Sequence, residues 1–358
     1  MIRLPIVHKP TTRRGFAGLC LASATFMSAS RIARSQTVKR RLRLLLNTGF
    51  SSPQAWLWVA LARGYLAAEE LELEISPGAG AYTAAPRMVQ EKYDLAYGDV
   101  NSLIEVCARR PEGAPRGVYM MFNASPSCVM VAAEGPIRHP NQLLGRRVVG
   151  HGSDVALRTF GALCQHLKLE SKRVSVVEAW ADMVGMAEDV LAARSAGAFG
   201  YVSTFTGALT AADPALLNKV RFLRFADYAP DLYGSVVMAS QRLLHDEPEL
   251  VSRVVRALNR GVVTMLRDPE AGLEAVLRSV PGLNRSAEAA RLRATLQLEM
   301  NPDLPSGERR MDLGDVDASR LDRSIALMAS ASGLPRKPAA TEIFTWSHLP
   351  PAAERERP

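Results

Sequence analysis

Apolar and polar positions alternate in short runs along the chain, and stretches with a helical period separate these runs. Residues 42–46 and 71–75 alternate with a period of two, which is typical of a half-buried strand. Ser52 and Pro53 mark the start of a helix and Gly64 its end. The same reasoning predicts further strands at 94–97 and 118–122, and further helices at 83–91 and 99–108.

The pattern restarts after residues 123–126. Strands are predicted at 128–133, 147–149, 174–177, 198–202 and 234–239, with helices beginning at Ser153 or Asp154 and spanning 182–194. Everything after residue 239 is mainly helical, beginning with 248–266. Strands and helices that alternate in this way predict an α/β fold.

The chain is long enough to form two lobes, because 358 residues with 47% hydrophobic content can fill two cores. We expect the helical tail to pack on the first lobe, so that the chain crosses between lobes near 123–127 and 228–235 and leaves a cleft. The predicted division is a signal at 1–35, one lobe from 36–124 plus 236–358, and a second lobe from 125–235.

The N-terminal segment has the features of a twin-arginine export signal. Arg13 and Arg14 precede an uncharged run at 17–29, and small residues at 33–35 mark a cleavage point before Gln36. A membrane anchor is the alternative, but the uncharged run is shorter than the roughly 20 residues that cross a bilayer. The segment therefore predicts a periplasmic protein.

The basic charge of the chain lies mostly in this signal. Its removal deletes six basic residues and no acidic ones, which lowers the formal net charge from +8 to +2. A nucleic-acid partner is therefore not expected. The remaining basic groups, at 39–43 and at Arg146 and Arg147, are predicted to lie on solvated strand faces.

Motifs for catalysis, metals and cofactors are not found in the sequence. Of four cysteines, Cys107, Cys128 and Cys164 follow the signal without C-x-x-C spacing, so one disulfide is possible and none is required. No histidine pair has metal-ligand spacing, and no G-x-S-x-G motif occurs. Residues 78–83 imitate a dinucleotide fingerprint, but Thr83 replaces its third glycine. We expect no cofactor, no metal and no enzyme activity.

Ligands of open α/β sheets bind beyond the carboxyl ends of strands, next to helix N-termini. This rule selects the loops at 47–56, 80–83, 98–101, 152–155 and 201–204, with the crossings nearby. Gly98 and Gly152 are expected to let backbone amides approach a ligand closely. The predicted ligand-binding residues are Gln54, Trp56, Tyr82, Gly98, Asp99, Asn123, Gly152, Ser153, Asp154, Tyr201, Thr204, Tyr228 and Tyr233.

Two of these assignments have an alternative. Trp56 and Trp58 are about 200° apart on a helix, so only one can face the cleft; Trp56 is favoured, but both could be packing residues. Asp99 and Asp154 could accept hydrogen bonds from a ligand amine, although capping a helix with no functional role is the favoured explanation of each. Negative charges in loops without Lys or Arg favour an uncharged or amine-bearing heteroaromatic ligand over nitrate or a sulfonate.

Several segments in a consistent order resemble a known family. The chain resembles the type II periplasmic solute-binding proteins of ABC transporters, in the group for thiamine pyrimidine precursors, alkanesulfonates, taurine and nitrate. It departs from them at Gly197, where the family usually has Asp, and at Gln54, where it often has His. The matching segments are 58–66, 93–101, 119–123, 141–150, 152–156, 231–234, 268–271 and 349–351.

The resemblance implies the periplasmic binding protein type II fold, with two α/β lobes joined by a two-strand hinge. It also implies an exported monomer that captures a small organic molecule, such as a thiamine-type pyrimidine or another heteroaromatic, and delivers it to an ABC permease in the inner membrane. One alternative is an enzyme similar to the iron-dependent pyrimidine synthases, which use a cysteine cluster that this chain lacks. The other is a ligand-sensing partner of a membrane receptor.

Overall fold

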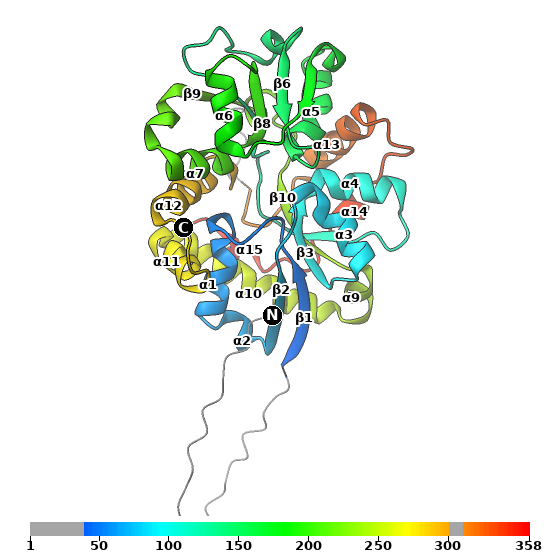
Figure 1. The fold of residues 1–358 in the computed structure, drawn as a ribbon. Coiled ribbons are helices and arrows are strands. Elements are labelled where there is room, and N and C mark those ends of the chain that lie inside the picture. Colours follow the sequence, from blue (N-terminus) through cyan, green and yellow to red (C-terminus); the bar gives the residue numbers. More distant parts are fainter. Residues whose placement is uncertain (1–38, 301–310) are drawn as a thin grey trace, which may run out of the picture. The chain divides into compact units, whose positions relative to one another are not determined.

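The computed structural model of the chain describes residues 39–300 and 311–358, which belong to one compact unit. Two sheets of five strands each form its framework, and helices pack against them (Figure 1). The export signal predicted at 1–35 lies outside the described residues. None of the helices in the two described ranges combines the length and the hydropathy of a membrane-spanning segment.

The first sheet has the strand order β2-β1-β3-β10-β4. Strand β1 pairs in parallel with β2 and β3, whereas β10 is antiparallel to both of its neighbours, β3 and β4. The last strand in the sequence therefore returns to the middle of the sheet. The bounds are Arg40–Leu45 for β1, Leu71–Ser76 for β2, Leu95–Asp99 for β3, Arg116–Met120 for β4 and Ser235–Ala239 for β10.

The second sheet follows the same plan, with the order β7-β6-β8-β5-β9. Strand β6 is parallel to β7 and β8, and β5 is antiparallel to β8 and β9. The bounds are Ser127–Ala132 for β5, Arg147–Gly150 for β6, Ser175–Glu178 for β7, Gly197–Tyr201 for β8 and Val220–Arg224 for β9. The sequence pattern predicts all of these strands except β9.

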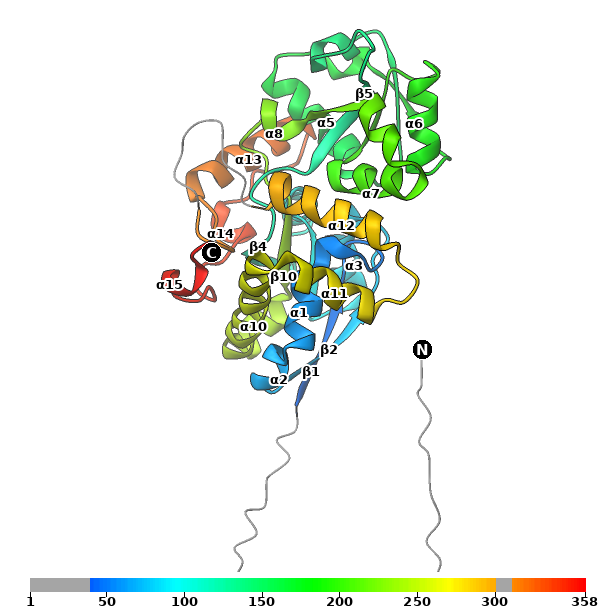
Figure 2. The same cartoon turned by 90° about the vertical axis from the view of Figure 1, so that its left-hand side faces the viewer.

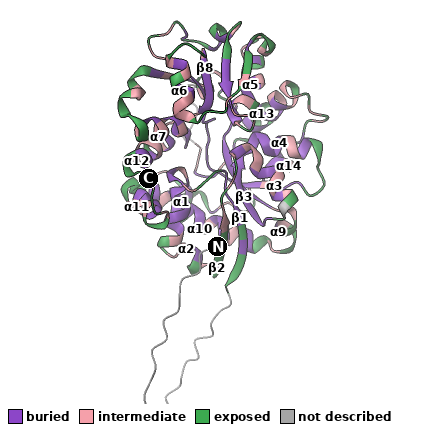
Figure 3. Ribbon diagram, in the orientation of Figure 1, coloured by how far each residue is buried: buried purple, intermediate pink, exposed green. Residues whose placement is uncertain are grey.

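Successive residues of a strand point to opposite faces, so each sheet packs between two layers of helices. In β1, Leu44 lies in a core formed with α1, α10 and α11, while Leu45 lies in another core formed with α3 and α4. Helix α5 covers one face of the second sheet, and α6 and α7 cover the other. The inner strands β3, β8 and β10 are accordingly almost entirely buried, whereas the edge strand β7 is largely exposed, as are the outer faces of the helices (Figure 3).

The bounds of the helices agree closely with the predictions in the first part of the chain. The α-helices of the described residues are α1 Ala55–Ala62, α2 Tyr65–Ala68, α3 Ala84–Glu91, α4 Val100–Arg109, α5 Val155–His166, α6 Met183–Leu191, α7 Val202–Ala212, α8 Phe225–Tyr228, α9 Gln241–Asp246, α10 Pro248–Arg267, α11 Pro269–Ser279, α12 Arg285–Ala294, α13 Ala318–Ala331, α14 Ala340–Ile343 and α15 Ala352–Arg355.

The helical tail contacts helices that cover the first sheet and helices that cover the second. This corrects the prediction that the tail packs on the first lobe. Helices α10 and α11 do pack against α1, beside the first sheet. Helix α12, however, packs along α7 of the second sheet, as both ribbon views show (Figures 1 and 2). Helix α13 lies between α4 and α5. The lobe boundaries at 124 and 235 remain a prediction.

Candidate functional site

The carboxyl ends of the two sheets meet at β3 and β8. The hydroxyl of Tyr201, the last residue of β8, donates to Oδ2 of Asp99, the last residue of β3, at 3.4 Å. A second contact joins the neighbouring loops, because a Cβ placed on Gly80 would lie 3.5 Å from Oγ of Ser153. Residues predicted from separate parts of the sequence are therefore neighbours here.

Asp99 and Asp154 both cap helices, so this predicted role is confirmed. Asp99 accepts from the backbone N–H of Asn101 at 2.9 Å at the start of α4, and Asp154 accepts from that of Ala156 at 2.7 Å at the start of α5. Burial raises the pKa of Asp99 to about 7 and that of Asp154 to about 6, although the capping hydrogen bonds act in the opposite direction. Both carboxylates are thus held in surroundings that disfavour their charge.

Glu299 is a site residue that the sequence analysis missed. It ends a π-helical turn at Thr295–Glu299, and its Oε1 accepts from the backbone N–H of Ser203 in the first turn of α7 at 3.1 Å. Its carbonyl accepts from the backbone N–H of Ala124 at 3.4 Å. Burial raises the pKa of Glu299 to about 7. The residue lies in the helical tail, where no strand end or loop motif in the sequence singles it out.

Buried polar side chains collect around Asp99, Tyr201 and Glu299. Ser235 is paired with Asp99 across β10 and β3, and Ser127 is paired with Tyr201 across β5 and β8. We call this set the polar cluster: Tyr97, Asp99, Asn101, Asn123, Ser127, Tyr201, Ser235 and Glu299.

Several atoms of the polar cluster are buried without a hydrogen-bond partner among the described residues. A buried polar group left in this state costs about 1–3 kcal/mol. Several unpaired polar groups close together are typical of a binding site, where a ligand supplies the missing hydrogen-bond partners. The atoms are Tyr97 Oη, Asn101 Oδ1, Asn123 Oδ1, Ser127 Oγ, Ser235 Oγ and Glu299 Oε2.

Trp56 and Gln54 lie behind the polar cluster. Trp56 is fully buried and contacts Tyr97 edge to face, with ring centroids 5.3 Å apart. Trp58 is also buried, against Phe50. The side-chain amide of Gln54 donates to Asn47 Oδ1 at 2.7 Å and accepts from the backbone N–H of Ser51. Partners within the first loop therefore occupy the hydrogen-bonding groups of this amide. Both tryptophans are thus packing residues in this structure, the alternative that the sequence left open.

The two predicted glycines have different surroundings. A Cβ on Gly98 would lie 2.4 Å from Cβ of Ala84 and 3.0 Å from the carbonyl oxygen of Ala81. Its small size is therefore required by the packing of α3 on β3 rather than by a ligand. A Cβ on Gly152 would lie 3.2 Å from Oε1 of Glu178, at the end of β7. Gly152 therefore sits in the loops at the carboxyl ends of the second sheet.

The other predicted tyrosines and Thr204 are distributed around the polar cluster. Tyr82 donates to Glu105 Oε2 at 2.6 Å and lies at the edge of the site, near Arg158. Thr204 is half-buried in the first turn of α7. Tyr228 packs on His139, with ring centroids 4.9 Å apart, and does not join the cluster. The hydroxyl of the buried Tyr233 accepts from the backbone N–H of Asp317, so only its carbonyl, bonded to Asn101, touches the cluster.

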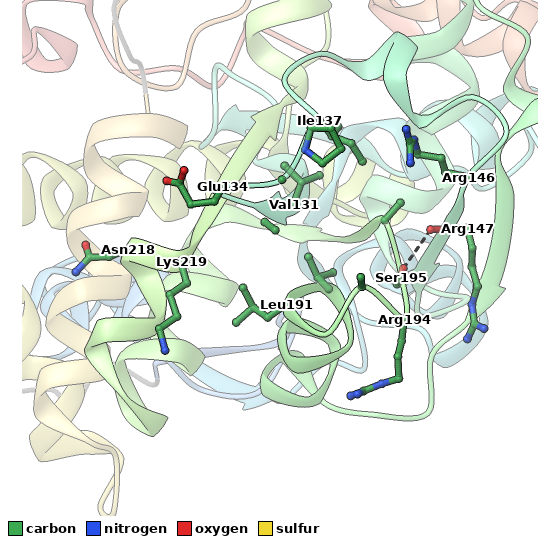
Figure 4. Close-up of a pocket in the computed structure, with 16 residues that line it drawn as sticks. Val131, Glu134, Ile137, Arg146, Arg147, Leu191, Arg194, Ser195, Asn218 and Lys219 are labelled. Atoms are coloured by element: carbon green, nitrogen blue, oxygen red, sulfur yellow. Dashed lines mark hydrogen bonds between the residues drawn. The ribbon is translucent and has the colours of Figure 1, made fainter.

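A cavity of about 830 Å³ lies elsewhere, at the amino ends of β6 and β8 (Figure 4). Val131, Ile137 and Leu191 are among its apolar lining residues, and Arg147 and Lys219 are among its basic ones. Parallel strands of α/β sheets bind ligands at their carboxyl ends. This cavity is at the opposite ends, so we locate the candidate site at the polar cluster.

The described residues contain neither a metal site nor an activated thiol. No group of three His, Cys, Asp or Glu side chains in the described residues could hold a metal ion. Cys107, Cys128 and Cys164 are buried and not in disulfides. Burial raises the pKa of Cys107 to about 12 and that of Cys164 to about 11, and it also raises that of Cys128. These thiols are therefore not prepared for nucleophilic chemistry.

A family model described as "NMT1/THI5 like" matches residues 53–272, which include every strand of the two sheets except β1. The chain belongs to the NMT1/THI5-like family. No curated protein matches this family member in sequence. The predicted resemblance is confirmed.

Solved structures with a similar fold include binding proteins and an enzyme. The periplasmic aliphatic sulphonate binding protein SsuA from Escherichia coli has 13% identity and a TM-score of 0.63, over 87% of this chain and 94% of that chain. A Candida albicans protein with the generic periplasmic binding protein fold has 16% identity and a TM-score of 0.60, over 87% and 98%. The desulfurization enzyme DszB has 16% identity and a TM-score of 0.57, over 88% and 99%.

These likenesses confirm the predicted fold, that of the periplasmic binding proteins. They also show that the fold accommodates both solute binding and catalysis, so the function has to be argued from the site.

Proposed function

We propose that this NMT1/THI5-like protein is the exported substrate-binding component of an ABC importer and captures a small organic solute between two lobes. The observation that supports the proposal is the polar cluster, in which buried side chains from both sheets leave hydrogen-bonding atoms unpaired within the described residues. A polar solute bound there would contact both sheets at once. The fold shared with SsuA supports the same class of function.

Capture needs closure but no covalent chemistry. A solute held between Asp99 of the first sheet and Tyr201 of the second contacts both lobes only when they are together, so it favours the closed population. We place the lobes at 36–124 plus 236–358 and at 125–235. The raised pKa values of the three thiols support binding rather than turnover.

The surroundings favour a small heteroaromatic solute, such as a thiamine-type pyrimidine. Tyr97 and Tyr201 offer aromatic surface, and Trp56 supports Tyr97 from behind. Asp99 and Glu299 offer oxygen acceptors that suit an exocyclic amine or a ring N–H. A flat molecule with N–H donors would therefore satisfy both the apolar and the polar parts of the site.

The proposed cellular setting rests on the twin-arginine segment and on the net charge of the chain. The twin-arginine segment would export the protein to the periplasm, where it would deliver the solute to an inner-membrane permease. With a net charge near +2 after cleavage, we propose a monomer that binds no nucleic acid.

Calorimetry of the purified protein with 4-amino-5-hydroxymethyl-2-methylpyrimidine, taurine and benzoate tests this function. We expect the aminopyrimidine to bind with a micromolar Kd, about −8 kcal/mol. Tyr201→Phe removes one hydroxyl from the site and should weaken binding about fivefold, which corresponds to the roughly 1 kcal/mol of one hydrogen bond.

Tyr65→Phe is the matched control. It removes the hydroxyl that bonds Thr264 at 3.0 Å, outside the polar cluster, and should leave the Kd unchanged. Absence of binding for every solute in the panel would contradict the proposed function.

A further inference from the structure

Six helices begin at the carboxyl ends of the parallel strands in the described sheets, and five of their first turns hold a carboxylate. Three are capped by the residue before the helix, namely α4 by Asp99, α5 by Asp154 and α6 by Asp182. The other two receive a carboxylate from a distant part of the chain. Glu288 serves the short 3₁₀ turn that leads into α1, and Glu299 serves α7.

The two distant carboxylates are well defined. Oε2 of Glu288 accepts from the backbone N–H of Ser52 at 2.7 Å, and the Ser52 hydroxyl donates to the Glu288 carbonyl at 2.8 Å. Oε1 of Glu299 accepts from the backbone N–H of Ser203 at 3.1 Å. The two residues are 4% and 0% exposed, so neither is a surface side chain resting on a helix end. The segment 285–299 thus caps one helix beside each sheet.

A helix N-terminus is where an anionic ligand is ordinarily held, because its free N–H groups and its dipole attract negative charge. Here a carboxylate of the protein already occupies that position at α1, α4, α5, α6 and α7. A sulfonate or carboxylate ligand would have to displace one of these groups or lie close to it. Above pH 7, where Asp99 and Glu299 are ionised, like charges in a buried site repel strongly.

The cations near these carboxylates do not offset the repulsion of an anionic ligand. Arg291 lies 3.4 Å from Oε1 of Glu288, and its charge lowers the pKa of Glu299 less than burial raises it. The buried Arg320 donates to the carbonyl oxygens of Asn123 and Leu232, and its guanidinium lies over the ring of Tyr233. Arg158 is exposed, donates to the carbonyl of Gly152 at 2.8 Å and lies over the ring of Tyr82. This is the edge where α3 begins, and the N-cap residue of α3, Thr83, makes no capping hydrogen bond with its side chain.

We infer that the capping carboxylates make the site selective against anionic solutes and that Glu299, together with Asp99, receives the N–H groups of a neutral or protonated amine. The inference rests on the proposed function, since it names the solute class of the same site. Glu299 suits this role because Oε1 is used by α7, while Oε2 is buried in the polar cluster without a partner among the described residues. Glu299 is then a specificity-determining residue rather than only a helix cap.

The test compares two solutes that share a pyridine ring and differ in charge, 3-picolylamine and pyridine-3-sulfonate, by calorimetry at pH 8, above the pKa of Asp99 and Glu299. The wild-type protein should bind the amine at least about tenfold more tightly than the sulfonate. Glu299→Gln should reduce this preference about tenfold, the effect of losing one charge-assisted hydrogen bond. The control Glu112→Gln changes an exposed glutamate in a loop and should leave the preference unchanged. Asp99→Asn provides a second variant if Glu299→Gln does not fold by circular dichroism.

Equal or tighter binding of the sulfonate would overturn the inference. If Arg158→Gln then abolished that binding, the anion site would lie at the start of α3 instead. Sulfonate binding, whether or not it depends on Arg158, would leave the proposed capture of a solute intact. If neither pyridine solute and no solute of the calorimetric panel bound, both the proposed function and this inference would be wrong.

Discussion

Asp99 and Glu299 illustrate at the residue scale how burial sets the chemistry of the site. The two carboxylates accept hydrogen bonds from backbone N–H groups, an asparagine amide and a tyrosine hydroxyl. Such donors only partly offset the loss of hydration, so the pKa of each carboxyl rises to about 7. Both groups therefore titrate close to neutral pH.

The stability of the ligand-free protein should consequently fall as the pH rises from 5 to 8. In the folded protein, Asp99 and Glu299 keep their protons up to pH of about 7, whereas in the unfolded chain they lose them near pH 4. The folded state thus binds more protons in this window, and by linkage its stability is highest below the folded pKa and is lost above it. We expect a decrease of about 5 kcal/mol in the free energy of unfolding, measured by denaturant titration at each pH.

Glu299→Gln should flatten this profile, because an amide does not titrate. Glu112→Gln, at an exposed position, should retain the wild-type slope. A profile that rises between pH 5 and pH 8 in the wild-type protein would show that the two carboxylates are charged and stabilised in the fold.

At the scale of elements, helix α1 is fixed to the first sheet by Trp56. Its ring is fully buried and contacts Tyr97 of β3. The sequence alone favours a position of Trp56 in the cleft. In that position, Trp56→Ala would leave the stability of the ligand-free protein nearly unchanged. The packing instead predicts a loss of about 3–5 kcal/mol in the free energy of unfolding, since the substitution leaves a cavity in the core.

Trp180→Ala is the matched control, because the side chain of Trp180 is 93% exposed. Its effect should stay within about 0.5 kcal/mol in the same denaturation experiment. Equal losses for the two variants would contradict the assignment of Trp56 to the core.

The strand pattern could be predicted from the sequence wherever alternation was clean, and the caps Asp99 and Asp154 could be predicted because they precede helices. Strand β9 was missed because two arginines interrupt its five residues and its pairing with β5 is a long-range contact. Glu299 was missed for a related reason: its role depends on α12 packing along α7, which no local pattern encodes. Tyr228 satisfied the local rule for the site but packs on His139 instead.

At the scale of the whole molecule, the proposed capture of a solute depends on weak contacts between the two sheets at their carboxyl ends. Tyr201 and Asp99 form one such contact, and Glu299 bridges the tail and α7 with another. These polar contacts are individually weak, about 1 kcal/mol each, so a solute that adds hydrogen bonds to both sides can shift the balance between open and closed forms.

Small-angle X-ray scattering with and without a saturating solute identified by calorimetry tests this account most directly. Closure of two lobes around the solute predicts a smaller radius of gyration in the bound protein. An unchanged radius of gyration at saturation would contradict capture by closure.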